Sequence, residues 1–307
     1  MSELHHGARV MHSGIPATHL RSDDGATALV CDHGAQLLSW CPAGGGEALF
    51  LSAASRFGSD AAIRGGVPII FPQFGAAGPG KRHGFARVQA WQFLGAAMDQ
   101  GSALARWELR GTLVHDAPAG THGSSDRGFI LGVEVRITGA GVDIALTITN
   151  PGATAWQCHA ALHTYLRVDD LGAVTLEGLQ GRPYVDQTVP GETAPSLAQI
   201  SDHPAQQEAQ LRFAGEVDRV YPQAPERLSL RDAANVLIVS QRGFRDTVVW
   251  NPGADKAAAL TDLEPGGERH FVCIEAAAVS QPLILGPGAT WRGVQQIQQL
   301  RRLARHC

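Results

Sequence analysis

The chain has few cysteines, and none lies in a metal-binding or disulfide pattern. The five cysteines form no Cys-x-x-Cys pair and are odd in number: Cys31, Cys41, Cys158, Cys273 and Cys307. An odd set without such pairs argues against a disulfide framework and against a zinc site. The sequence therefore predicts reduced thiols, a cytoplasmic location and no bound metal.

Long apolar runs are also absent. No run approaches the roughly 18 apolar residues of a membrane-spanning helix, and the stretch MSELHHGARVMHSGIP has no apolar region of signal-peptide type. The net charge of −4 and isoelectric point near 6.3 give no basic field for nucleic acid. We expect a soluble protein with no membrane or nucleic-acid partner. His5 and His6 could bind a metal, but so near the chain end we expect them to be solvated.

Helical patterns are sparse. The best candidates are a short helix over Ala205–Leu211 and a single turn over Asp255–Leu260, whereas Ala117–Asp126 and Asp186–Gln199 read as irregular loops. A chain of 307 residues could hold two average domains, but large all-β sandwiches reach this length as one. With no repeat or linker visible, we predict a single all-β domain over residues 1–307.

Short strands make up most of the remaining pattern. Asp99-Gln100-Gly101 and Gly139-Ala140-Gly141 are small enough to close hairpins, and Asn150-Pro151-Gly152 ends a strand because proline cannot continue the ladder. These hairpins predict one large antiparallel β-sandwich. The predicted strands are Ala28–Asp32, Gln36–Trp40, Trp91–Ala96, Ala103–Leu109, Phe129–Thr138, Val142–Asn150, Trp156–Val168, Arg227–Leu230, Val236–Gln241 and Phe271–Ala276.

The most informative segment runs from Ile63 to Trp91: IRGGVPIIFPQFG, a Gly/Pro-rich break, then HGFARVQAW. Four polar side chains, those of Arg64, Gln73, His83 and Arg87, lie here among small and apolar residues. A rigid wall of this kind helps to expose polar groups that are not needed to fill a core. Two guanidinium groups and one imidazole could converge on an anionic, hydroxylated ligand. The alternative is an extended, proline-limited strand whose arginines face water.

Further motifs follow this segment in order: LHTYLRV from Leu162, DRVY from Asp218, VVWNP from Val248, VCIEAA from Val272 and LGPGATWRGVQQI from Leu285. Together they resemble the glucose-6-phosphate 1-epimerase branch of the aldose 1-epimerase superfamily. The resemblance implies a supersandwich with a sugar cleft, and an isomerase that interconverts the anomers of small-molecule hexose 6-phosphates without a cofactor. We expect a monomer, because no extended helical seam or swapped segment is visible.

Anomer exchange needs one base and one acid. The base removes the proton of the anomeric hydroxyl, the acid delivers a proton to the ring oxygen, and the ring opens to an aldehyde. Rotation about C1–C2 and reclosure invert the anomeric carbon, with no hydride, electron or metal required. A carboxylate ionised at neutral pH and an imidazole that can hold a proton suit these two roles.

The resemblance implies that His163 is the acid and Glu275 the base. Alternation in HAALHTYLRV places Ala161, His163 and Tyr165 on one face of a strand. Glu275 lies in the otherwise apolar FVCIEAAA, where an unpaired carboxylate is costly to bury. The alternatives are a structural histidine and a solvent-facing glutamate. Ala276 stands where many relatives carry proline, which should alter the rigidity of the strand end and leave the carboxylate chemistry intact.

The resemblance also implies that His83 and Asp218 hold sugar hydroxyls. His83 precedes Gly84, so the backbone can approach a ligand closely and the ring can donate or accept a hydrogen bond. Asp218 could instead cap a turn or pair with the neighbouring arginine. Trp250 or Phe74 could stack on the sugar, although an aromatic side chain in a β-rich protein more often belongs to the core.

Arg64 and Arg87 are the predicted phosphate ligands, because a guanidinium fork matches phosphate geometry and stays charged at all relevant pH values. Gln73 is placed with them among the substrate-binding residues. Lys81 and Arg82 could strengthen the positive field or could point to solvent.

Two other functions remain open from the sequence. A mutarotase for an unphosphorylated aldose such as galactose would need His163 and Glu275 without the arginine pair. A non-catalytic carbohydrate-binding sandwich would need aromatic and polar groups without a matched acid and base. Anomer exchange measured on glucose 6-phosphate and on glucose separates all three.

Overall fold

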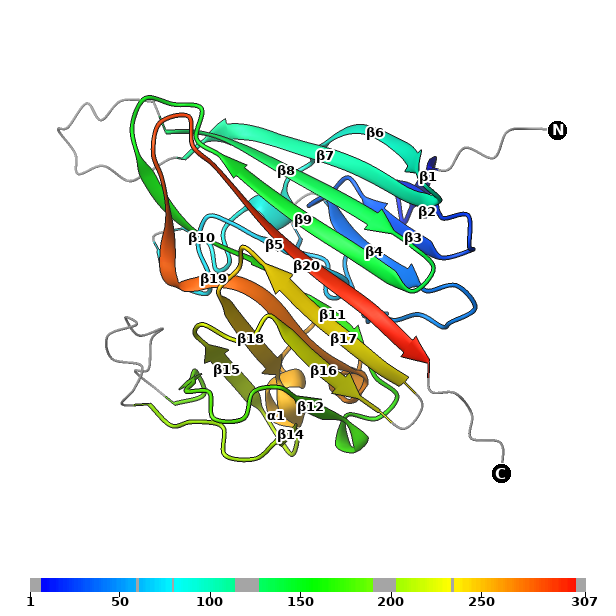
Figure 1. Ribbon diagram of the computed structural model, residues 1–307, viewed down its shortest axis with the longest axis vertical. Coiled ribbons are helices and arrows are strands. Elements are labelled where there is room, and N and C mark those ends of the chain that lie inside the picture. The colour runs from blue at the N-terminus through cyan, green and yellow to red at the C-terminus, as the bar shows by residue number, and fades with distance from the viewer. Residues whose placement is uncertain are drawn as a thin grey trace.

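Antiparallel strands make up most of the regular secondary structure in the computed structural model (Figure 1). The predicted all-β fold is confirmed: the strands form three sheets. Some features named above lie outside the described residues: the predicted loop Ala117–Asp126, most of the loop Asp186–Gln199, and His5, His6 and Cys307. The structure describes residues 7–58, 61–78, 80–113, 127–189, 203–232 and 235–301.

The smallest sheet comes from the N-terminal part of the chain and has four antiparallel strands in sequence order. Leu20, Val30 and Trp40 join the main hydrophobic core, whereas Ala17, Cys31 and Leu38 belong to a separate small cluster. The strands are β1 (Gly7–His12), β2 (Ile15–Arg21), β3 (Thr27–Cys31) and β4 (Gln36–Cys41).

The largest sheet has nine strands and runs diagonally across the molecule in Figure 1. Every second side chain of β8 is buried, as expected where one face of a sheet packs on a core and the other does not. In spatial order the strands are β14 (Gln210–Arg212), β12 (Thr175–Glu177), β16 (Arg227–Arg231), β17 (Asn235–Arg242), β20 (Thr290–Arg301), β9 (Gly141–Thr149), β8 (Gly128–Ile137), β7 (Ser102–Thr112) and β6 (Gln92–Asp99).

The predicted turns of this sheet are confirmed. Gln100 and Gly101 join β6 to β7 with φ angles of 49° and 82°, the pair of left-handed residues that a tight hairpin turn requires. A short turn around Ala140 likewise joins β8 to β9, and β9 ends at Thr149, immediately before Asn150 and the predicted proline stop.

The third sheet has seven strands and carries the site described below. Its order is β13 (Val185–Asp186), β15 (Val217–Tyr221), β18 (Asp246–Asn251), β19 (Phe271–Leu285), β10 (Trp156–Leu162) and β5 (Ile69–Ile70), and β11 (Tyr165–Arg167) pairs with β19 beyond the end of β10. The first nine residues of β19 are all buried, so both faces of this central strand are covered.

The two faces of β19 belong to different clusters. Val272, Ile274 and their i+2 successors pack in the main core, together with residues of the nine-stranded sheet. On the opposite face, Cys273 belongs to one small cluster and Ala277 to another. The position between those two, on the same face, is Glu275.

Two predicted elements differ from the structure. The helix predicted over Ala205–Leu211 is wrong: the backbone of Gln206 bonds instead to Gly181 and Arg182, so its hydrogen bonds run to another segment and β14 follows from Gln210. The strand predicted over Trp156–Val168 is interrupted between β10 and β11, because Thr164 N donates to the carbonyl of Leu162 in its own segment, although both strands keep one register on β19.

Helices are short. The single turn predicted at Asp255–Leu260 is confirmed as α1 (Gly253–Ala257), which begins two residues earlier. In the described part of the chain, the remaining helical turns are the 3-10 segments η1 (Ala86–Val88), η2 (Leu171–Ala173) and η4 (Gly267–His270). Among the residues that the structure describes, no helix is long and apolar enough to cross a membrane.

Gly66 joins three segments by backbone contacts. It has a φ of 60°, its N–H donates to Phe50 O at 2.7 Å, and its carbonyl accepts from Tyr165 N at 2.9 Å. A β-carbon at this position would lie 2.1 Å from the carbonyl oxygen of Leu37. Only glycine therefore fits where the chain leaves Arg64 and passes toward the catalytic face.

Gly66→Ala is expected to lower the free energy of unfolding by more than the roughly 1–2 kcal/mol that left-handed backbone alone costs a residue with a β-carbon. The added clash with the Leu37 carbonyl is the reason. Urea denaturation measures the change. Gly46→Ala is the matched control, because this glycine is exposed, has no left-handed φ, and a β-carbon there would meet no atom within 4 Å. Similar midpoints for the two variants would contradict this account of Gly66.

Candidate active site

Glu275 is the most deeply buried ionisable group of the site, with 1% of its surface exposed. It projects from the middle of β19 on the face turned away from the main core, opposite Val248 of β18. Because β19 is paired on both sides, its pleat fixes the direction of this side chain. Its oxygen Oε2 is buried and has no hydrogen-bond partner among the described residues.

His163 lies directly beside Glu275. Its Nε2 atom is 3.4 Å from Glu275 Oε1, and 6% of the residue is exposed. The register of the sheet places the imidazole there, since Leu162 pairs with Ala276 and Tyr165 with Cys273, which sets His163 opposite Glu275. The ring nitrogen Nδ1 has no hydrogen-bond partner among the described residues.

Aromatic rings fix the orientation of this imidazole. The ring of Tyr165 is stacked on it, with centroids 4.9 Å apart and planes 11° from parallel. Trp250 and His83 approach it edge-on, with centroids at 5.7 Å and 5.6 Å. Phe74, the other aromatic considered for stacking on the sugar, packs at 5.0 Å against His83 instead.

Burial pushes the acid and the base toward their neutral forms. It raises the pKa of Glu275 well above its usual value, and the charge of Asp218 adds to this shift. Burial likewise lowers the pKa of His163, with further contributions from His83, Arg87 and Arg64. One proton shared by this buried pair can therefore pass between the carboxyl group of Glu275 and the imidazole of His163.

His83 is held as a neutral ring. The backbone φ of 65° is left-handed, and the backbone N–H donates to Gly75 O at 2.9 Å. The ring atom Nδ1 accepts from Gly75 N at 3.3 Å. Burial, followed by the charges of Arg87 and Arg82, lowers its pKa to about 3. Because Nδ1 is an acceptor, the proton of the neutral ring lies on Nε2.

Asp218 and Gln73 lie in different surroundings. Asp218, on β15 opposite Trp250, is 7% exposed, and burial raises its pKa to about 6. Gln73 holds the loop that follows it, because its Oε1 accepts from Gly80 N at 2.8 Å and its Nε2 faces the carbonyls of Gly75, Gly78 and Gly80. The Gln73 amide therefore braces this loop through hydrogen bonds to its backbone.

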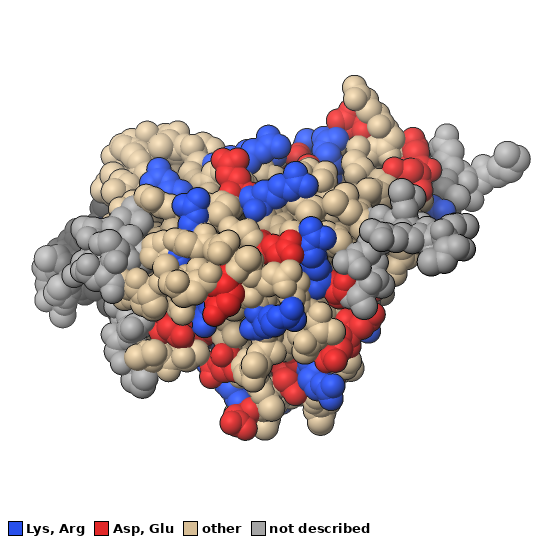
Figure 2. Space-filling model, turned by 60° about the horizontal axis from the view of Figure 1, so that its bottom comes forward, with Lys and Arg blue, Asp and Glu red and all other residues tan. Residues whose placement is uncertain are grey.

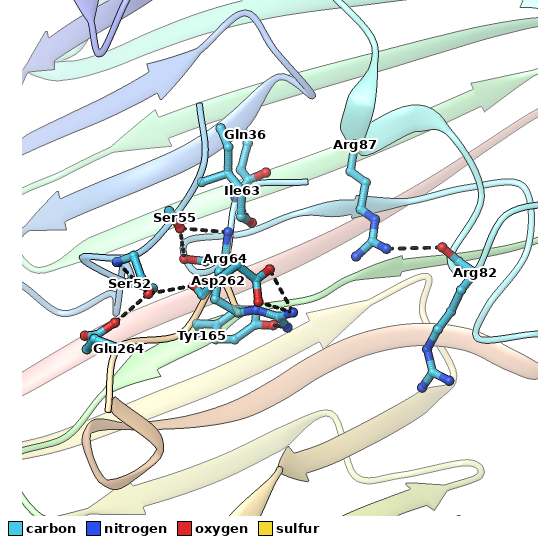
Figure 3. A network of polar contacts seen from close by, with 11 residues as sticks. Gln36, Ser52, Ser55, Ile63, Arg64, Arg82, Arg87, Tyr165, Asp262 and Glu264 are labelled. Carbon is cyan, nitrogen blue, oxygen red and sulfur yellow. Dashed lines mark hydrogen bonds and ion pairs between the residues drawn. The ribbon is translucent and has the colours of Figure 1, made fainter. Parts of the chain in front are cut away.

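Arg64 and Arg87 line one cavity of about 340 Å³, together with Tyr165 and Asp262. Arg64 Nη2 donates to both carboxylate oxygens of Asp262 at 3.0 Å, and Nη1 donates to Tyr165 Oη at 3.0 Å (Figure 3). Arg87 Nη2 donates to the carbonyl of Arg82 at 3.1 Å. Among the described residues, no carboxylate lies within ion-pair distance of Arg87.

Lys81 and Arg82 do not line this cavity, and both are exposed. In Figure 3 the guanidinium of Arg82 points away from Arg64 and Arg87, and only its carbonyl contacts Arg87. Arg82 is nevertheless close enough to Asp218 to oppose the rise of that pKa.

The cavity is also lined by Arg56, Tyr165 and Asp262, which were not among the predicted site residues. Tyr165 had a signal, because it alternates with His163 on one face of LHTYLRV. No sequence signal indicated Asp262, because it lies 198 positions from Arg64, to which it binds. No group of three His, Cys, Asp or Glu side chains in the described part of the chain could hold a metal ion.

The family of the chain follows from a match over most of its length. A family model described as aldose 1-epimerase matches residues 16–298. The chain belongs to the aldose 1-epimerase family. It is therefore an isomerase, and the predicted enzyme class is confirmed over a non-catalytic sugar-binding sandwich.

Relatives of this aldose epimerase carry narrower names. A protein of Cenchrus ciliaris is 32% identical over 295 residues, which cover 92% of this chain and 84% of the relative. A protein of Escherichia coli K12 is 29% identical over 280 residues, covering 87% and 88%. Both are named "Putative glucose-6-phosphate 1-epimerase".

Solved structures share the fold of this aldose epimerase. The "putative mutarotase (YeaD)" of Salmonella typhimurium superposes with a TM-score of 0.83 at 25% identity, covering 98% of this chain and 96% of that one. The crystal structure of HI1317 superposes with a TM-score of 0.75 at 24% identity, covering 98% of each chain. The fold predicted from the motifs is thereby confirmed.

Glu275→Gln is expected to raise the thermal unfolding midpoint of the ligand-free protein at neutral pH. The pKa of Glu275 is higher in the folded than in the unfolded state, so its stabilising contribution is full below the unfolded pKa and is lost as pH rises through the folded one. Glutamine keeps the shape and never ionises. The advantage of the variant should therefore widen as pH rises from the ordinary glutamate value of 4.5 through neutrality.

Differential scanning calorimetry across this range measures the trend. Glu226→Gln, at an exposed position, is the matched control and should show no comparable widening. A Glu275→Gln advantage that stays constant with pH would refute the idea that ionising this carboxyl group in the ligand-free protein is costly.

Proposed function

We propose that this aldose epimerase interconverts the α and β anomers of hexose 6-phosphates, glucose 6-phosphate among them. The observation that carries the proposal is the cavity next to His163, reached through Tyr165, which is lined by three arginines, Arg56, Arg64 and Arg87, and by one carboxylate, that of Asp262. An excess of positive charge in a confined space suits a phosphate group. The names of the two relatives support the same substrate class.

Donor groups in this cavity remain available. Arg64 Nε is buried and has no hydrogen-bond partner among the described residues. Arg87 uses Nη2 for a backbone carbonyl, and burial lowers its pKa because the charged form is poorly solvated there. Buried donors without acceptors are costly. A phosphate that accepts from both arginines would remove this cost and restore counter-charge.

The attraction to phosphate is local, because the molecule as a whole carries a net charge of −4. On the face drawn in Figure 2, basic and acidic side chains are interspersed rather than gathered by sign. Selectivity for an anionic sugar would therefore arise within the cavity and not from long-range steering.

The catalytic pair can act in concert on an anomeric centre. With Glu275 as base, its carboxylate takes the proton of the O1 hydroxyl, and protonated His163 gives a proton to the ring oxygen as the C1–O5 bond breaks. Rotation about C1–C2 then presents the other face of the aldehyde. On reclosure His163 recovers a proton and Glu275 returns one, so the enzyme ends in its starting protonation state.

His83 and Asp218 would bind sugar hydroxyls in this arrangement. The neutral His83 ring can donate from Nε2, and Asp218 can accept; together with the edge of Trp250 they border the same face of the sheet. Gln73 would act indirectly, by bracing the loop that carries His83.

We further infer that the protein works in a reducing compartment such as the cytoplasm. The four described cysteines are free thiols. Burial raises the pKa of Cys31 and of Cys158 to about 12, which keeps both thiols protonated and unreactive.

The second candidate is a mutarotase for an unphosphorylated aldose. One observation favours it: Asp262 already neutralises Arg64 with a bidentate contact at 3.0 Å. A hydroxymethyl group would need no further charge there. The guanidinium of Arg87 weighs against it, because a neutral sugar would leave that charge without a counter-ion.

Glu275→Gln and His163→Asn are each expected to lower anomer exchange by at least roughly 10²-fold, the usual effect of removing one general catalyst. Exchange NMR of glucose 6-phosphate with catalytic amounts of protein measures the rate. Circular dichroism and the unfolding midpoint check that each variant is folded. A folded variant with a near wild-type rate would remove that residue from its role.

Arg87→Ala and Arg64→Ala are expected to lower kcat/KM for glucose 6-phosphate by roughly 10- to 150-fold, from the 1.5–3 kcal/mol typical of a hydrogen bond to an ionised group. Exchange of unphosphorylated glucose should change little. The ratio of the two losses, obtained by the same NMR method, is the deciding quantity.

Arg106→Ala is the matched control for these variants, since this arginine is more than half exposed and pairs only with Glu134 on the nine-stranded sheet. Equal losses on both sugars in the cavity variants would assign the arginines a structural role. A wild-type protein that prefers free glucose or galactose would overturn the phosphosugar proposal itself.

A further inference from the structure

The Tyr165 side chain connects the catalytic imidazole to the anion cavity. Its ring stacks on His163 at 4.9 Å, and its hydroxyl oxygen accepts from Arg64 Nη1 at 3.0 Å. The residue is 2% exposed and packs its remaining surface against Phe271 and Trp250.

The Arg64 end of this connection is firmly anchored. Asp262 holds Nη2 of Arg64 with both oxygens, and the loop of Asp262 is itself bound, because Ser52 Oγ donates to the Asp262 carbonyl at 2.8 Å. Ser55 Oγ contacts the Arg64 backbone at both N and O, at 2.9 Å and 2.8 Å. The backbone and Nη2 of Arg64 are therefore held, Nη1 meets Tyr165, and Nε has no partner among the described residues, so a bound anion can restrain the guanidinium further.

The His163 end depends on ring packing. Because Nδ1 has no hydrogen-bond partner among the described residues, no hydrogen bond at that nitrogen sets the plane of the ring. The nearly parallel stack with Tyr165 does so instead, while Nε2 faces Glu275 at 3.4 Å. A small tilt of the phenol would therefore tilt the imidazole relative to the base.

We propose that Tyr165 is a positioning residue that couples the anion cavity to His163, so that an anion held by Arg64 and Arg87 speeds ring opening of a sugar that itself carries no phosphate. The inference rests on the proposed phosphosugar function. An anion fixes Arg64, Arg64 fixes the phenol, and the phenol fixes the imidazole over Glu275. Binding energy from the non-reacting part of the substrate is thus used at the reacting centre.

The test separates the substrate into two pieces. Anomer exchange of xylose, an aldose without C6, is measured by NMR with and without inorganic phosphate, and the exchange catalysed by phosphate alone is subtracted using protein-free samples. In the wild-type protein, phosphate should accelerate xylose exchange in a saturable way. In Tyr165→Phe, which keeps the ring and loses the hydroxyl, the acceleration should fall to about one-tenth, the lower end for a hydrogen bond from a charged donor.

Tyr221→Phe is the matched control. Tyr221 is also a fully buried tyrosine, but its hydroxyl bonds to Gln206 Oε1 at 3.2 Å, remote from Arg64 and His163 in the hydrogen-bond network. The same atom is removed, so any general loss of stability should be comparable. The acceleration by phosphate should remain at the wild-type level.

Inhibition of glucose 6-phosphate exchange by inorganic phosphate gives a second readout. Tyr165→Phe should still bind phosphate, because Asp262 continues to hold Arg64, and its loss on glucose 6-phosphate should fall on kcat rather than on KM. Full acceleration in Tyr165→Phe, or a loss confined to KM, would overturn the coupling while leaving the phosphosugar function in place. A wild-type protein that neither binds phosphate nor prefers glucose 6-phosphate over glucose would instead overturn the proposed function on which the coupling depends.

Discussion

An ionisable carboxyl group on a strand that is buried on both faces is the constraint on which the site depends. Glu275 occupies the centre of β19, paired to β18 on one side and followed on the other by the break between β10 and β11. The apolar setting that aims the side chain also disfavours its charge. In the ligand-free protein the Glu275 carboxyl group is thus held where its charged form is unfavourable. A substrate stabilises this carboxyl group most when it shares a proton and offers hydroxyl groups for hydrogen bonds.

The position of the acid follows from the same sheet. β10 and β11 keep one register on β19, with Leu162 opposite Ala276 and Tyr165 opposite Cys273, so His163 lies opposite Glu275 on the same face of the sheet. On its other side the segment follows the register of β5, because His163 N bonds to Pro68 and Tyr165 N bonds to Gly66. This pairing and the left-handed Gly66 together bring the Arg64 segment against the catalytic face.

Sequence reasoning succeeded where information is local. The hairpin at Gln100 and Gly101, the all-β pattern and the carboxylate in an apolar strand each depend on residues a few positions apart. It failed where a partner is distant. Nothing near Arg64 indicates Asp262, and the helix predicted over Ala205–Leu211 was wrong because its backbone bonds to residues 181 and 182, which a local pattern does not reveal.

Sequence patterns also fail to show which way a side chain points, even when its chemistry is clear. Gln73 has the chemistry of a sugar ligand, yet its amide contacts three carbonyls of its own loop, and only the folded chain of Gly75 to Gly80 decides between these uses. Tyr165 shows the converse. Its alternation with His163 was legible in the sequence, but its meaning arises only once Arg64 is brought to its hydroxyl group.

The ion pair of Arg64 with Asp262 sets the charge balance of the whole site. Arg64 and Arg87 lie close enough for each charge to disfavour the other, and one carboxylate offsets part of that repulsion in the ligand-free protein. With both arginines unpaired, the fold would carry two uncompensated guanidinium groups beside a neutral imidazole. With both paired, only the exposed Arg56 would remain to attract an anion. One carboxylate for two half-buried arginines therefore keeps Arg64 in place and leaves Arg87 as the charge that an anionic substrate can satisfy.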